Sequence, residues 1–411
     1  FSISGKISIQ GSAVGITTAP TFGASSTLEY KNVSTRTTNA IEWPSSNGPS
    51  NLIIDNSGST VTMLASNNRT LTGDLTLTAG TLADNGNTLT VQGNIAGTGT
   101  HSGAGSITMS GATSSKSISG ATLGNLTLND ADGFSLSGSP TINGNLVLTA
   151  GTLTLGANTL TYNGSSITRT SGNIDASNGS ATLAFTKSSA VSLPASLFSG
   201  NVNNLTINGS GGLTLGSSTT VAGTLALTSG TLTTGANTFT YFGSSITRSS
   251  GNINASNTSG GVTFTNTSGL TLPSSLFTGT VNALTINGSG GITLGSGLTL
   301  TTLNLSSGTF TVGSSNTVSV SSGGSVNRTS GTLASGTDGG KFSFSGTGTV
   351  SGTVGFNNVD IAGGVDFGTA STINGTLTIN SGGFVSNNKP PIYGTSSKLY
   401  YFTTGNYGRG A

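Results

Sequence analysis

Apolar residues in this chain recur in pairs two positions apart, and successive pairs begin seven residues apart. Two apolar side chains at i and i+2 lie on one face of a short strand. The residues between pairs are mainly glycine, asparagine and serine, which form turns. Three strands with their turns make a coil of roughly 20 residues, which is typical of stacked repeat units. The clearest run consists of Leu146 with Leu148, Leu153 with Leu155, and Leu160 with Tyr162.

This pattern predicts an all-β fold, a single-stranded right-handed parallel β-helix (β-solenoid) with three short faces. One coil buries too few side chains to offset the entropy of ordering its own residues. Stacked coils share a core, and their main-chain groups pair with the neighbouring coil. We therefore expect one continuous stack of about 20 coils. No helix is expected, because glycine and threonine are dense and no apolar pattern of period 3.6 persists.

Longer repeats divide the chain into modules. Residues 151–223 and 230–302 align at a constant offset of 79, with 48 of 73 positions identical. A fainter phrase, N-L-T-I followed by glycine-rich turns and G-T-L, recurs on either side. The interpretation is an N-terminal partial module at 1–50, repeat modules at 51–124, 125–203, 204–282 and 283–357, and a truncated module at 358–411. Because 26–43 also resembles the C-terminal phrase at an offset of 371, we expect the chain to continue in a longer protein.

Composition narrows the range of functions. Of 411 residues, 13 are Lys or Arg and 11 are Asp or Glu, with one His and no Cys. A chain without cysteine has neither disulfides nor thiolate metal sites. A net charge of +2 without a basic stripe argues against nucleic acid as a partner. No segment approaches the ~18 uninterrupted apolar residues of a membrane helix, so no direct membrane insertion is expected.

One acidic cluster, Asp130-Ala131-Asp132-Gly133, is a candidate cation site. A D-x-D-G loop can bind calcium through carboxylate and carbonyl oxygens. The equivalent positions in the other close copies read NGSGG, without acids. A plain turn is the favoured interpretation of Asp130 and Asp132, and a weak calcium site is the alternative. No other cofactor is expected.

Three arginines recur at equivalent positions, Arg169, Arg248 and Arg328, in SITRTSG, SITRSSG and SVNRTSG. The favoured interpretation is structural, with each guanidinium bonded to turn carbonyls or stacked on an aromatic ring. The alternative is contact with an anionic glycan. Copies about four coils apart would lie too far from one another to form one pocket.

Prolines and aromatic residues leave a further alternative open. Pro194 and Pro273 mark corners or loops that leave the coil. Phe198 and Phe277 are expected to return these loops to the core, and exposed rings binding sugar are the alternative. The same two interpretations apply to the aromatic residues that gather towards the two ends of the sequence, namely Trp43, Tyr393, Tyr400, Tyr401 and Tyr407.

Threonine patterns and acids bear on two less favoured functions. T-x-T phrases are common, and threonine columns on a flat solenoid face can bind ice. Modules of variable length are expected to break the register that such a face needs. Polysaccharide-degrading β-helix enzymes use clustered carboxylates. Eleven acids in 411 residues, with no pair repeated across the close modules, predict that the chain is not an enzyme.

Several phrases carry a resemblance to a known group of proteins. They read EWPSSNGPSNLIIDNSG, GTLTLGANTLTYNG, NNLTINGSGG and KLYYFTTGNYGRGA. These phrases resemble the long repetitive surface proteins of Bacteroidetes, which are adhesin-like and often exported through the type IX secretion system. The resemblance implies an extracellular location on the bacterial cell surface and supplies no catalytic residues. The sorting domain typical of the group is not found in these residues.

Together these observations predict a structural or adhesive segment of a secreted, fibre-like repeat protein that acts as a stiff spacer or adhesin stalk. Its expected partners are other cell-surface or extracellular matrix components, glycans, or further copies of itself. A carbohydrate-binding β-helix is the alternative. An enzyme acting on polysaccharide and an ice-binding protein are less favoured.

Overall fold

The structure, a computed structural model, describes residues 1–12, 15–111, 114–335, 340–386 and 389–402. In these residues the chain consists of strands and turns without a helix. Parallel strands stack as a β-solenoid of about 19 turns with roughly 21 residues per turn, so the predicted fold class is confirmed. The chain forms two compact units, Phe1–Gly212 and Leu213–Ala411, called unit 1 and unit 2 below.

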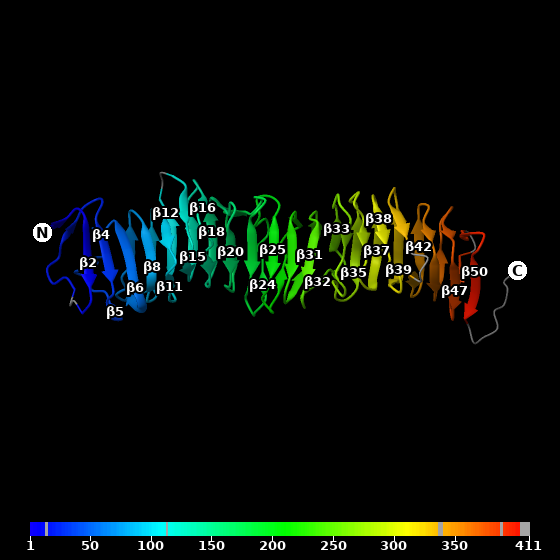
Figure 1. The fold of residues 1–411 in the computed structure, drawn as a ribbon, viewed down its shortest axis with the longest axis horizontal. Helices are drawn as coiled ribbons and strands as arrows, with labels where there is room; N and C mark the ends of the chain where they lie inside the picture. The colour runs from blue at the N-terminus through cyan, green and yellow to red at the C-terminus, as the bar shows by residue number, and fades with distance from the viewer. Residues whose placement is uncertain (13–14, 112–113, 336–339, 387–388, 403–411) are drawn as a thin grey trace. The chain divides into compact units, whose positions relative to one another are not determined.

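In the middle of unit 1 (Figure 1), from β9 to β20, three strands make one coil, and each strand pairs in parallel with the strand three places later. Leu146 in β18 faces Ile167 in β21, so this coil advances 21 residues. The strands of unit 1 are β1 (Ser2–Ile3), β2 (Lys6–Gln10), β3 (Thr21–Phe22), β4 (Thr27–Lys31), β5 (Arg36–Thr37), β6 (Asn51–Thr62), β7 (Arg69–Leu71), β8 (Leu75–Ala83), β9 (Thr88–Val91), β10 (Ile95–Gly97), β11 (Thr100–Ser102), β12 (Ser106–Ser110), β13 (Lys116–Ile118), β14 (Thr122–Leu123), β15 (Leu126–Asn129), β16 (Phe134–Leu136), β17 (Thr141–Ile142), β18 (Leu146–Ala150), β19 (Thr152–Thr154), β20 (Thr159–Tyr162), β21 (Ile167–Arg169), β22 (Asn173–Asp175), β23 (Thr182–Phe185), β24 (Val191–Ser192) and β25 (Asn204–Ile207).

The core of unit 1 consists of columns of apolar side chains that run from coil to coil. In the parallel sheet β21–β18–β15–β12–β9–β7, Ile107, Leu126 and Leu146 follow one another in register. All three are at most 1% exposed. Burying one such side chain contributes about 1.5–3 kcal/mol relative to leaving it in water. The apolar pairs seen in the sequence are therefore the inward positions of the strands, as predicted.

Unit 2 has the same construction, with more aromatic side chains in its core. Phe342 and Phe356 lie edge to face with ring centroids 5.3 Å apart, and Phe356 contacts Phe367 in the same manner at 6.1 Å. Its strands are β26 (Leu213–Thr214), β27 (Thr219–Val221), β28 (Thr224–Leu227), β29 (Thr231–Thr233), β30 (Thr238–Tyr241), β31 (Ser245–Arg248), β32 (Asn252–Asn254), β33 (Gly261–Phe264), β34 (Leu270–Thr271), β35 (Val281–Ile286), β36 (Ile292–Thr293), β37 (Leu298–Leu305), β38 (Thr309–Thr311), β39 (Thr317–Arg328), β40 (Thr332–Ala334), β41 (Lys341–Phe344), β42 (Gly348–Ser351), β43 (Gly355–Phe356), β44 (Asn358–Ile361), β45 (Gly364–Asp366), β46 (Thr372–Ile373), β47 (Thr376–Asn380), β48 (Phe384–Val385), β49 (Ile392–Tyr393) and β50 (Lys398–Phe402).

Some strands continue around a corner and change face. The register between β6 and β8 shifts between Asp55 and Thr60, where β6 bends. Gly58 in β6 and Gly323 in β39 both have positive φ, of 74° and 78°, at this type of corner. Glycine adopts this conformation without steric cost. These corners shape the outer surface at which a ligand could bind.

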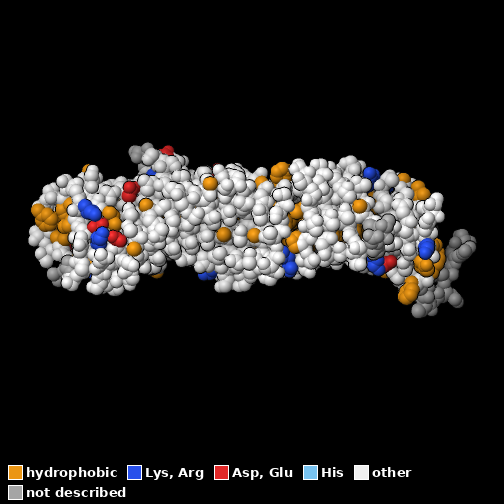
Figure 2. Space-filling model, in the orientation of Figure 1, with side chains coloured by type: hydrophobic (Ala, Val, Ile, Leu, Met, Phe, Trp, Pro, Cys, Tyr) orange, Lys and Arg blue, Asp and Glu red, His pale blue; other side chains and the backbone are white. Residues whose placement is uncertain are grey.

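The outward positions carry mostly threonine, serine and asparagine. Figure 2 shows that charged side chains are sparse on the visible face, and most of its surface is neither charged nor apolar. Threonine is favoured on the outer face of a pleated sheet, because its branched side chain packs against neighbours while its hydroxyl stays in water.

Candidate functional site

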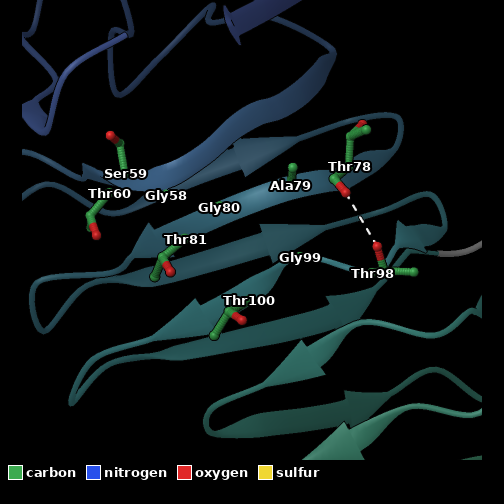
Figure 3. A pocket seen from close by; sticks show the side chains of 10 residues that line it. All are labelled: Gly58, Ser59, Thr60, Thr78, Ala79, Gly80, Thr81, Thr98, Gly99 and Thr100. Atoms are coloured by element: carbon green, nitrogen blue, oxygen red, sulfur yellow. Dashed lines mark hydrogen bonds between the residues drawn. The ribbon is translucent and has the colours of Figure 1, made fainter. Parts of the chain in front are cut away.

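An open groove with a volume of about 440 Å³ lies at the corner of three successive coils of unit 1. We call it the threonine groove. Figure 3 shows the ten residues that line it, which belong to β6, to β8, to the turn after β10 and to the start of β11. The lining residues are Gly58, Ser59, Thr60, Thr78, Ala79, Gly80, Thr81, Thr98, Gly99 and Thr100.

One side of the groove belongs to a column of threonines in register. Thr60 pairs with Thr81, and Thr81 pairs with Thr100. The column continues to Thr161 and is interrupted there, because Thr161 pairs with Ala184 in the next coil. Its first three members, Thr60, Thr81 and Thr100, line the groove. Its later members are Thr122, Thr141 and Thr161.

The floor of the groove requires glycine. Gly80 has φ of 78°, and a Cβ at this position would lie 2.0 Å from the main-chain oxygen of Asn56. The backbone of one coil therefore rests directly on the corner of the preceding coil. Across the rim, the Thr98 hydroxyl donates to the Thr78 main-chain oxygen at 3.3 Å (Figure 3). The shape of the groove is thus fixed by close backbone packing and by a hydrogen bond between coils.

The chemistry of this groove is limited to neutral hydrogen bonding. Its lining offers hydroxyl groups and main-chain atoms, without an ionisable or aromatic side chain. General acid–base and nucleophilic catalysis both need a titratable or activated group. The groove can therefore hold a neutral polar ligand, but its lining residues supply neither a general base nor an activated nucleophile.

The repeated arginines clamp turns. The Nε atoms of Arg169, Arg248 and Arg328 each donate to the main-chain oxygen three residues later, at 2.7, 2.6 and 2.5 Å. The acceptors are Gly172, Gly251 and Gly331. The favoured structural interpretation of these residues is therefore the one that the geometry supports. Arg169 and Arg248 also donate from Nη2 to the side-chain oxygens of Asn173 and Asn252. Because the three arginines are only partly buried, the glycan alternative stays a prediction.

The acidic cluster is occupied by a cation from the chain itself. Asp130 forms a buried ion pair with Lys116, whose Nζ also donates to the main-chain oxygens of Gly111 and Ser114. Burial would raise the pKa of Asp130, but hydrogen bonds from Lys116 and from the Asp132 N–H outweigh it and lower the pKa. Asp132 is exposed. The two carboxylates are thus in different environments, and the lysine ammonium takes the place that calcium would have beside Asp130.

The aromatic residues named from the sequence fall into two classes. Trp43 is fully buried, whereas Tyr393, Tyr400 and Tyr401 are 44%, 54% and 58% exposed. Tyr407 lies outside the described residues.

The loops that contain Pro194 and Pro273 return to the coil through isolated parallel β-bridges. One bridge joins Phe198 to Ile174, and the other joins Phe277 to Ile253.

A buried polar cluster around Trp43 was not anticipated from the sequence. Glu42 is fully buried and accepts hydrogen bonds from the Tyr30 hydroxyl at 3.0 Å and from Arg36 at 2.8 Å. Arg69 lies over the Trp43 ring and donates to the Trp43 main-chain oxygen at 2.8 Å. The cluster fastens the long loop between β5 and β6 to the core. The sequence feature that could have indicated this cluster is the chain's one tryptophan, Trp43, directly after the acidic residue Glu42.

A second buried pair also escaped prediction. His101 Nε2 lies 3.1 Å from Asp84 Oδ2, and both side chains are fully buried. His101 Nδ1 accepts the N–H of Gly124, so the neutral ring carries its proton on Nε2. His101 pairs with Leu82 of the preceding coil, so it fills an inward position that holds an apolar residue there.

Two findings concern the described residues as a whole. They contain no group of three or more His, Asp or Glu side chains arranged to hold a metal ion. Within the same residues, no helix has the length and apolar character needed to cross a bilayer.

Comparison with protein-family models, with curated proteins and with solved structures gave no significant match. The β-solenoid repeat architecture is therefore the property on which a functional proposal for this chain rests.

Proposed function

We propose that this chain is a structural or adhesive segment of a secreted, fibre-like repeat protein of the bacterial cell surface, where each unit serves as a stiff spacer. The observation that carries the proposal is the parallel stacking of strands from coil to coil, with apolar columns such as Leu160, Leu183 and Leu205 in register. Every coil is held to the next by main-chain hydrogen bonds and by shared apolar side chains, so bending between coils would break both.

The charged residues support a mechanical role. Charged pairs hold neighbouring coils together: Lys6 with Glu29 at 3.0 Å and Lys31 with Asp55 at 3.2 Å. Another pair, Lys341 with Asp360, joins β41 to β44. With so little free charge on the outside, the stack is expected to respond weakly to salt. We assign no catalytic step to this chain.

The finer parts of the proposal follow from the resemblance in sequence phrases. They are an extracellular location, export through the type IX system and adhesion to surface or matrix components, glycans or further copies. A stalk outside the cell needs resistance to proteases. Short turns tied by side-chain hydrogen bonds present little extended backbone to a protease.

The spacer role is tested by measuring one distance inside unit 1. The chain has no Cys, so two can be introduced for spin labels, at Thr70→Cys and Thr168→Cys. Both positions are exposed and lie on the first and last strands of a six-stranded parallel sheet. Five strand steps separate them by roughly 24 Å.

We expect a single narrow distance distribution near that value, unchanged between low and high salt. A matched pair on neighbouring strands, Thr70→Cys and Thr90→Cys, spans a single coil step and gives the width that the labels themselves contribute. A distribution much broader than the control, or one that changes with salt, would contradict the spacer role.

A further inference from the structure

A second corner groove lies in unit 2, and two residues in it depart from the repeat. It has a volume of about 280 Å³ and follows the corner at Gly323. We call it the phenylalanine groove. Where the threonine groove has only small neutral residues, this one contains a ring, Phe384, and a carboxylate, Asp366. Its remaining lining is Thr347, Gly348, Thr349, Gly364 and Ser386.

The ring and the carboxylate lie on neighbouring strands. Phe384 in β48 pairs with Gly364 in β45, two residues before Asp366. Side chains at i and i+2 lie on the same face of a strand, so Asp366 points to the side on which the ring lies. In the preceding coil, Asp366 faces Thr349, which belongs to an outward column of hydroxyls. The acid thus replaces a hydroxyl in that column.

The position of the ring depends on Gly364. A Cβ on Gly364 would lie 2.5 Å from the Cζ atom of Phe384 and 2.8 Å from its Cε2 atom. The tip of the ring therefore occupies the space that any other residue would fill, and the ring lies back across β45. Phe384 is still 56% exposed. A large apolar ring held outward at an otherwise polar corner has no packing role in the core.

The carboxylate is fixed as well. Asp366 Oδ1 accepts the N–H of Gly368 at 2.8 Å, which holds the side chain in an Asx turn. Its second oxygen can accept hydrogen bonds from a ligand. The hydroxyls of Thr347, Thr349 and Ser386 can both donate and accept.

From this combination we propose that the phenylalanine groove binds a neutral oligosaccharide. The ring of Phe384 packs against the apolar C–H face of one pyranose, and Asp366 accepts hydrogen bonds from its hydroxyls. A sugar that carries carboxylate or sulfate is disfavoured, because Asp366 would repel it. The groove crosses four strands, roughly 14 Å, which suits a short oligosaccharide better than a single ring. The binding site does not rest on the spacer role.

The test uses the whole 411-residue chain and three neutral probes: cello-, manno- and xylo-oligosaccharides. Saturation-transfer NMR identifies which of them binds, and calorimetry gives the Kd. We expect Phe384→Ala to weaken binding by about tenfold or more, as for an aromatic residue at the centre of a contact. Asp366→Asn should weaken binding less, because the amide oxygen can still accept one hydrogen bond. Gly364→Ala should weaken binding by displacing the ring.

The matched control is Phe242→Ala, which removes another exposed ring of unit 2, 47% exposed and outside this groove. It should leave the Kd unchanged. If Phe384→Ala fails to fold, Phe384→Leu keeps the apolar contact with Gly364 and still removes the flat ring. Absence of binding to all three probes, or an equal loss with Phe242→Ala, would overturn the proposal. Neither result would affect the distance measured between Thr70→Cys and Thr168→Cys.

Discussion

Asn87 donates a hydrogen bond from its side-chain amide to the main-chain oxygen of Leu64, which lies one coil earlier, at 3.0 Å. The same amide donates to the Asp84 main-chain oxygen at 2.6 Å, and its oxygen accepts the N–H of Asn67 at 2.5 Å. Asn87 is 2% exposed, so it joins two coils inside the protein. Later copies of the corner repeat the bond to the preceding coil: Asn158 to Leu136, Asn237 to Leu215 and Asn316 to Leu294.

Replacing Asn87 by Ala should lower the free energy of unfolding by about 1–3 kcal/mol, because three main-chain groups lose a buried partner. Urea unfolding followed by circular dichroism measures the change. Asn129→Ala serves as the control, because it removes the same amide from an exposed strand end. Equal effects of the two substitutions would show that the link between coils contributes nothing.

The arginine clamp gives a second prediction. Arg169→Ala removes the bond from Nε to the Gly172 main-chain oxygen and should cost about 0.5–1.5 kcal/mol, since the side chain is only half-buried. Arg169→Lys should not restore it, because an ammonium lacks the planar fork. Lys187→Ala removes the same charge elsewhere in unit 1 and should leave stability unchanged.

Binding to a polyanionic polysaccharide separates the clamp from the glycan alternative. If Arg169 acts on the turn alone, Arg169→Ala and Lys187→Ala should alter polyanion binding equally. Loss of that binding with Arg169→Ala only, without a change in the urea midpoint, would favour an anionic-glycan contact.

The coil could be predicted from the sequence because its signal is local and periodic. Leu153 and Leu160 alternate with threonines, and each alternation marks one strand of one coil. The corner asparagines were visible in the repeats only as turn formers. Their bonds to the preceding coil involve residues more than 20 positions away, and single-chain periodicity does not encode such a partner.

The candidate sites were harder to predict for a related reason. Phe384 and Asp366 are 18 residues apart in the sequence and become neighbours only through the strand register. Neither belongs to a repeated phrase, so a search for repeated chemistry passes over them. Asp130, by contrast, stood out in the sequence, but its partner Lys116 was not linked to it before the fold was known.

Low pH should lower the free energy of unfolding of unit 1, because Asp84 becomes protonated. Burial would raise the pKa of this carboxyl, but His101 and the N–H groups of Gly86 and Gly105 outweigh burial and lower it. Because the folded pKa is below the unfolded value of about 3.9, the unfolded chain takes up the proton first as the pH falls. The stabilising contribution is therefore complete at neutral pH and is lost as the pH falls below about 4.

Urea midpoints measured from neutral to acid pH test this dependence. Asp84→Asn should be less stable at neutral pH and should lose part of the decline in acid. The exposed Asp132→Asn is the control and should keep the wild-type profile. An Asp84→Asn profile parallel to that of the wild type would rule out Asp84 as a source of the acid sensitivity.

High pH should lower the stability of the fold by ionising the buried tyrosines. Burial raises the pKa of Tyr162 and of Tyr241 to about 12, although main-chain hydrogen bonds partly oppose it. The folded pKa is above the unfolded value of about 10, so this contribution is complete below pH 10 and is lost as the pH rises towards 12. Tyrosinate absorbance should therefore rise in two stages. Tyr241→Phe should reduce the late stage, whereas Tyr400→Phe, at an exposed ring, should not.

The register of the apolar columns can be tested at one residue, Leu183. It is 1% exposed and stands between Leu160 and Leu205 in successive coils. Leu183→Ala should cost about 2–5 kcal/mol, because the cavity is enclosed by coils on both sides and cannot collapse. Thr161→Ala is the matched control on the outer face, where the next coil already has Ala184 at the paired position, and it should cost less than about 0.5 kcal/mol. Similar urea midpoints for the two variants would mean that the columns do not hold the coils together.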